Sequence, residues 1–70
     1  MGVMKIGTQV RRAREQALLT QEELATRARI GLTTLNRIER NHADPQFRTI
    51  RKIAKALDVN PRDLIGDDDE

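Results

Sequence analysis

Apolar residues recur every three or four positions in five stretches of the chain, which is the spacing of one face of an α-helix. No stretch strictly alternates apolar and polar residues, so the pattern predicts no β-strand. Each stretch is too short to be stable as an isolated helix, but five together can close one core. We therefore expect an all-α fold, a compact five-helix domain. The residues expected to face its core are Ile6, Val10, Ala13, Ala17, Leu24, Ala25, Ala28, Leu35, Ile38, Phe47, Ile50, Ile53, Ala54, Leu57, Leu64 and Ile65.

Several predicted helices begin at residues that suit a helix start. Thr20 is followed three positions later by Glu23, the spacing of a capping box in which each side chain bonds the other residue's backbone N–H. Gly31 can begin the next helix, although less well than serine or threonine. Asn60 followed by Pro61 predicts a capping residue and the favoured first-turn proline of the last helix.

The second and third predicted helices are short and are separated by a tight turn. Alanines at positions 25 and 28 allow the two helices to approach each other closely. Two helices joined by a turn of three to four residues form a helix-turn-helix arrangement. The pattern places this motif at about residues 21–40, with its second helix at about residues 32–40.

The outward face of the segment 32–40 is polar and carries no acidic residue. On a helical wheel Thr33, Asn36, Arg37 and Arg40 lie within about 50° of the direction opposite Leu35 and Ile38. Arginine can bond guanine O6 and N7 together, asparagine can pair with adenine, and threonine can reach a base edge or a methyl group. We interpret this face as one that reads the major groove of DNA; the alternative is an ordinary solvated surface.

Two charged residues fall on the inward side of their helices. Arg14 lies on the apolar stripe of the first helix, and Glu39 lies near the inward face of the third. An unpaired buried charge is costly, and two opposite charges relieve each other. We therefore predict that Arg14 and Glu39 form an ion pair that joins the third helix to the first; the alternative is that both side chains extend to solvent.

The charge of the chain is unevenly distributed. The net charge is +2, but positions 67–70 read Asp-Asp-Asp-Glu, so the remaining 66 residues hold 13 basic and seven acidic residues, a net charge of +6. A small basic body favours a polyanionic partner. We expect one domain over residues 1–66, followed by a disordered acidic tail over residues 67–70.

The composition argues against several classes of function. The chain has no cysteine, no serine and a single histidine, His42, which excludes thiolate metal sites and serine or cysteine nucleophiles. We expect no enzyme, no cofactor and no metal. No apolar run is long enough to span a membrane or to form a secretion signal, so we expect a cytoplasmic protein that does not bind membranes.

Three motifs occur together in the chain: Leu-Thr-Gln-Glu-Glu-Leu-Ala at 19–25, Thr-Leu-Asn-Arg-Ile-Glu-Arg at 34–40 and Ile-Ala-Lys-Ala-Leu-Asp-Val at 53–59. They are accompanied by Ile6, Val10, Arg14 and Pro45. In these motifs the chain resembles the lambda-repressor-like (Cro/cI, or XRE) helix-turn-helix DNA-binding family, over roughly residues 6–65. The resemblance implies a five-helix domain, usually dimeric, that binds double-stranded DNA at a pseudo-palindromic site and regulates transcription as a repressor. It also implies the family's internal ion pair between Arg14 and Glu39.

The resemblance further implies which residues would touch DNA. The positions that face the bases are Leu32, Thr33, Asn36 and Arg37. The positions that contact phosphates are Thr20, Gln21, Arg40, Asn41 and His42.

The chain departs from the family at positions where glycine is common. It carries Leu18, Arg29 and Asn41 there, and glycine serves such positions because the backbone takes positive φ. Asn41 tolerates that conformation well and Arg29 less well, while Leu18 can instead extend the first helix. Gly31 and Leu32 replace the cap and polar residue common at the start of the reading helix, and Leu32 could meet a thymine methyl or a protein.

Two other functions are compatible with parts of this pattern. A protein-interaction module, such as an antitoxin that sequesters a toxin and binds DNA only to regulate itself, would use the same fold, although the chain lacks the long extra segment that would favour it. RNA binding is disfavoured, because recognition of single strands usually needs aromatic stacking platforms. Phe47 is the only aromatic residue and is expected in the core.

Overall fold

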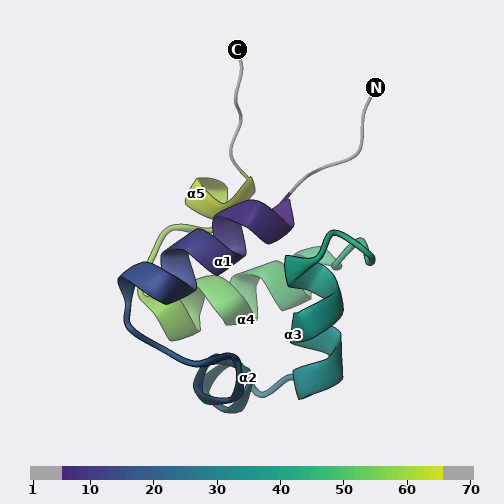
Figure 1. The fold of residues 1–70 in the computed structure, drawn as a ribbon. Coiled ribbons are helices and arrows are strands. Elements are labelled where there is room, and N and C mark those ends of the chain that lie inside the picture. The colour runs from purple at the N-terminus through teal and green to yellow at the C-terminus, as the bar shows by residue number, and fades with distance from the viewer. Residues whose placement is uncertain (1–5, 66–70) are drawn as a thin grey trace.

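The computed structural model describes residues 6–65 and contains five helices over that range: α1 (Ile6–Gln16), α2 (Gln21–Ala28), α3 (Leu32–Glu39), α4 (Phe47–Leu57) and α5 (Pro61–Ile65). No strand occurs among these residues, so the predicted all-α, five-helix fold is confirmed. Figure 1 shows α4 in the middle of the domain, with α1 and α5 on one side of it and α2 on the other. The predicted acidic tail, 67–70, lies outside the described residues.

Every helix contributes to a single core. Its largest fully buried side chains are Ile6, Val10, Leu24, Leu35, Ile38, Ile50, Ile53 and Leu64. All eight were expected on the inward faces from the helical spacing of apolar residues. The helical periodicity therefore predicted correctly which residues in the middle of each helix face the core.

Three residues at helix ends do not face the core as expected. Ala17 is exposed because α1 ends at Gln16, one residue before it. Phe47 is 68% exposed and Ile65 is 37% exposed. Phe47 is the first residue of α4, and burial on this helix begins only at Ile50, three residues further on. Periodicity assigns a face to a residue but does not say where the neighbouring helix ends.

The helices are separated by residues with left-handed backbone conformation. Leu18, Arg29 and Asn41 each have φ of 60°, and Asp58 has φ of 58°. The expectation of positive φ holds for Arg29 and Asn41, but Leu18 does not extend α1: its left-handed backbone ends the helix, and its side chain is 89% exposed. Asp58, which ends α4 in the same way, was not anticipated.

Replacing Arg29 with glycine is expected to leave stability unchanged or to raise it by about 1 kcal/mol. Arg29 ends α2 with φ 60° and ψ 44°, a conformation that glycine adopts without strain, although glycine also adds freedom to the unfolded chain. Arg27→Gly, within the helix, is the matched control and should cost about 1 kcal/mol. Urea melts compare the variants, and a clear loss with Arg29→Gly would show that the arginine side chain makes a needed contact.

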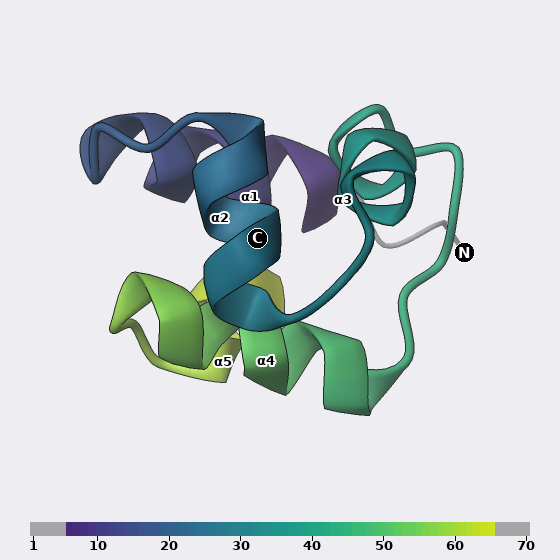
Figure 2. The same cartoon turned by 90° about the horizontal axis from the view of Figure 1, so that it is seen from below.

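The helix-turn-helix pair has the expected caps. The Oγ1 atom of Thr20 accepts from the N–H of Glu23 at 3.0 Å, and the N–H of Thr20 donates to Oε1 of Glu23 at 2.8 Å. Gly31 precedes α3 with an extended backbone and has no side chain to cap it. Figure 2 shows α2 running from the side of α1 toward α4, with α3 beside it. This packing leaves one face of α3 outside the core.

The first turn of α1 lies directly against the end of α3, and only glycine allows this approach. A Cβ atom on Gly7 would clash with the carbonyl oxygen of Ile38 and would lie 2.9 Å from that of Glu39. These atoms belong to backbone, so they cannot move aside as a flexible side chain would. Gly7 thus fixes how closely α1 and α3 pack.

Replacing Gly7 with alanine is expected to lower the free energy of unfolding by about 1–2 kcal/mol. Alanine normally stabilises a helix relative to glycine by about 1 kcal/mol, but here its methyl group would overpack the contact with α3. A urea melt measures whether the free energy of unfolding falls or rises. A stability equal to or above that of the unchanged chain would show that α1 can shift without cost.

Candidate nucleic-acid interface

The outward face of α3 carries two exposed polar side chains, Thr33 and Arg37, and the half-buried Asn36. The exposed Arg40 is the C-cap residue directly after the helix. Leu32, at the start of the helix, is 43% exposed. The single acidic residue of α3, Glu39, is buried on the opposite side. The helical wheel therefore placed these side chains on the correct sides, and the exposed face has hydrogen-bond donors and positive charge without a competing carboxylate.

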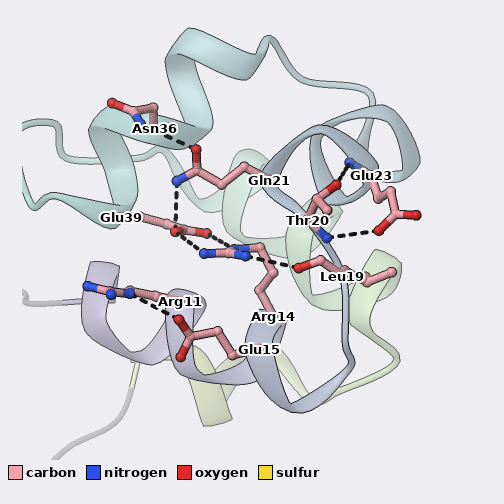
Figure 3. A network of polar contacts seen from close by, with 9 residues as sticks. All are labelled: Arg11, Arg14, Glu15, Leu19, Thr20, Gln21, Glu23, Asn36 and Glu39. Atoms are coloured by element: carbon pink, nitrogen blue, oxygen red, sulfur yellow. Dashed lines mark hydrogen bonds and ion pairs between the residues drawn. The ribbon is translucent and has the colours of Figure 1, made fainter.

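The side chain of Asn36 is hydrogen-bonded to that of Gln21, at the start of α2. Its Nδ2 atom donates to Oε1 of Gln21 at 3.3 Å. Figure 3 shows the two side chains pointing toward each other across the space between the helices. The contact limits the orientation of Asn36 and leaves its Oδ1 atom and one N–H free for a base edge. The sequence offered no signal for this pair, because it depends on how α2 and α3 cross.

The amide of Gln21 continues inward to a buried ion pair. Its Nε2 atom donates to Oε1 of Glu39 at 3.0 Å, and the same carboxylate accepts from Nε and Nη2 of Arg14 at 2.7 and 3.0 Å. Arg14 also donates from Nη1 to the carbonyl oxygen of Leu19 at 2.9 Å. The two charged side chains therefore meet, as their positions on the inward faces suggested.

This network is largely shielded from water. The side chains of Arg14 and Glu39 are 13% and 3% exposed. Hydrogen bonding to Glu39 raises the pKa of Arg14 above its ordinary value, so the guanidinium stays charged. Asn36 is thus connected through Gln21 to a buried charged pair that joins α1 to α3, an arrangement that can hold the side chain of Asn36 in place.

The other residues expected at phosphates lie at the two ends of the helix-turn-helix pair. Thr20 is exposed beside Gln21 at the start of α2, and its hydroxyl proton is free because the oxygen accepts the capping bond. Arg40, Asn41 and His42 follow α3 and are exposed. The N–H of His42 bonds the carbonyl of Arg37 at 2.9 Å, which closes the turn after the helix.

Within residues 6–65, no group of three acidic, cysteine or histidine side chains is placed to hold a metal ion. None of the helices described there is long and apolar enough to cross a membrane.

A second basic surface is formed by the end of α2 and by α4. Arg27, Arg29, Lys52 and Lys55 line an open hollow of about 590 Å³ between the end of α2 and α4, and no acidic residue lines it. These side chains are exposed. They add to the positive field around the domain but are not part of the face that α3 presents.

Comparison with known proteins relates the chain to helix-turn-helix regulators and to a phage repressor. The family model described as Helix-turn-helix matches residues 10–64. The chain is 33% identical over 66 residues to the HTH-type transcriptional regulator ImmR of Bacillus subtilis, covering 94% of this chain and 52% of ImmR. It is 29% identical over 65 residues to the immunity repressor protein of Bacillus phage phi105, covering 93% and 45%. The chain spans about half the length of these two relatives.

A solved structure resembles the whole domain. The restriction-modification controller protein C.AhdI from Aeromonas hydrophila is 33% identical in sequence and superposes with a TM-score of 0.84. The match covers 87% of this chain and 92% of C.AhdI.

Proposed function

The chain belongs to the lambda-repressor-like helix-turn-helix family of transcriptional regulators, and on that basis we propose that it binds double-stranded DNA sequence-specifically, with α3 in the major groove. The observation that carries the proposal is the outward face of α3, which presents Thr33 and Arg37 to solvent, is followed directly by the exposed Arg40, and has no exposed acidic residue. A groove-reading helix needs such donors, because the duplex is a polyanion with acceptors on its base edges.

Base reading is assigned to Leu32, Thr33, Asn36 and Arg37. Arg37 is exposed in the middle of α3, where its planar fork suits O6 and N7 of guanine. Asn36 has an acceptor and a donor left for adenine after bonding Gln21. Leu32, at the first position of α3, would meet a thymine methyl group.

Phosphate contacts are assigned to Thr20, Gln21, Arg40, Asn41 and His42. Thr20 and Gln21 lie at the N-terminus of α2, where the helix dipole favours an anion. Gln21 has a second role in this proposal: since it holds Asn36, it supports base reading as well as contacting the backbone. Arg40 supplies a full positive charge just after α3.

We further propose that the protein acts as a homodimer and represses transcription. Two copies related by a two-fold axis would place two reading helices about one turn of DNA apart, and the site would be a pseudo-palindrome. Repression is suggested by the relative that is named an immunity repressor.

The test is selection of binding sites from random duplex DNA, followed by titration of the selected duplex. A site with two related half-sites, bound far more tightly than unrelated DNA, is the expected result. The exposed Leu32 on the same face favours the alternative of a protein-interaction module. Failure to enrich any sequence, together with a protein partner whose binding is lost in Leu32→Ala, would replace DNA reading with that alternative.

A further inference from the structure

Asn41 has two structural roles that a glycine at this position could not combine. It takes a left-handed backbone with φ of 60°, and its Oδ1 atom accepts a hydrogen bond from the N–H of Gly7 at 3.0 Å. Gly7 lies in the first turn of α1, where backbone N–H groups have no partner within the helix. Asn41 therefore supplies α1 with a cap from 34 positions further along the chain.

This bond determines which way the carboxamide of Asn41 faces. An N–H donor must meet an oxygen, so Oδ1 points inward at Gly7 and Nδ2 points away from it. Asn41 is exposed, and among residues 6–65 no acceptor is bonded to its Nδ2 atom. The side chain thus presents two N–H donors to solvent at the end of α3, next to Arg40.

The backbone around this contact leaves little room for rearrangement. The missing Cβ of Gly7 lets α1 sit against the carbonyl oxygens of Ile38 and Glu39, and a Cβ there would lie 2.8 Å from Oδ1 of Asn41. The N–H that orients the carboxamide is therefore held by packing of the helix, not by a mobile side chain.

We propose that Gly7 is a positioning residue for DNA binding: its N–H locks the carboxamide of Asn41 so that Nδ2 donates to a phosphate oxygen of the duplex. The inference rests on the proposed function. It adds a residue of α1 that would support DNA binding through Asn41 without contacting the DNA itself. Because the lock is a single backbone hydrogen bond, it fixes a donor that would otherwise rotate freely.

Two matched substitutions separate capping from phosphate binding. Asn41→Asp keeps an oxygen for the N–H of Gly7 and replaces the outward donor with a negative oxygen. Asn60→Asp is the control, because Oδ1 of Asn60 likewise accepts a backbone N–H, that of Arg62 at 3.3 Å, at the start of α5. Figure 1 shows the α4–α5 connection on the opposite side of the domain from the α3–α4 connection. Both variants add the same charge.

Asn60→Asp should not lower the melting temperature, because a carboxylate caps a helix start as well as an amide does. Asn41→Asp keeps the acceptor for the N–H of Gly7, but its charge also lies just past the C-terminal end of α3, so it should cost no more than about 1 kcal/mol. Asn41→Asp should weaken binding to every duplex by roughly ten- to hundredfold, since a phosphate contact is lost and a repulsion is added. Asn60→Asp should change it by less than about threefold. The affinity ratio between the two variants is the readout, because it removes the effect of net charge.

Each other outcome is decisive. If the unchanged chain binds its selected duplex tightly and Asn41→Asp binds within about threefold of Asn60→Asp, the inference is wrong and Asn41 is not a phosphate contact, while the other contacts of the proposed function stand. If the unchanged chain binds no duplex, the proposed function fails first.

Discussion

Replacing Glu39 with alanine is expected to lower the free energy of unfolding by about 3–5 kcal/mol, the largest effect of any change considered for this protein. The carboxylate is 3% exposed and accepts two hydrogen bonds from Arg14 and one from Gln21. Alanine leaves the guanidinium of Arg14, only 13% exposed, without its counter-charge. The loss is mainly the cost of that stranded charge, not the net value of the pair.

A double-mutant cycle tests this explanation. Arg14→Ala should be about as costly as Glu39→Ala, because it strands the carboxylate instead. The double variant should cost much less than the two single losses added together. Glu15→Ala, which breaks the exposed pair with Arg11, is the control and should cost about 0.5 kcal/mol or less. Additive losses in urea melts would show that Arg14 and Glu39 contribute independently.

Replacing Arg37 with alanine is expected to cost about 1–3 kcal/mol of binding free energy on the preferred DNA site and to relax the choice of one base pair. The side chain is exposed, so truncation should leave the fold and its melting temperature unchanged. Titration against single-base variants of the selected site measures the change.

Arg40→Ala is the matched comparison, because it removes the same charge just beyond the end of α3. It should weaken binding to all sequences alike and lower the magnitude of the salt slope by about 1. If Arg37→Ala behaves in the same way, Arg37 contacts the backbone and the reading face is wrongly assigned.

The helices could be predicted from the sequence because their signals are local. Apolar spacing identified the inward faces, and Thr20 with Glu23 marked the start of α2. Even the meeting of Arg14 and Glu39 could be anticipated, since each lies on an inward face where a lone charge is costly.

The features that were missed depend on where helices end and how they dock. Phe47 follows the apolar stripe of α4 but is exposed at its first position, before the buried part of the stripe begins at Ile50. Leu18 has a left-handed backbone, but leucine is not a residue type that predicts this conformation. The bonds of Gln21 to Asn36 and of Gly7 to Asn41 join segments that are distant in the chain, so no local pattern encodes them.

Methylation interference on the selected duplex tests most directly whether α3 reads the major groove. Guanine N7 lies in the major groove and adenine N3 in the minor groove, and both can be methylated in the free duplex. N7 methylation of one guanine in each half-site should block binding of the unchanged chain, and Arg37→Ala should lose this sensitivity. Interference confined to adenine N3, or the same N7 interference with Arg37→Ala, would contradict this prediction.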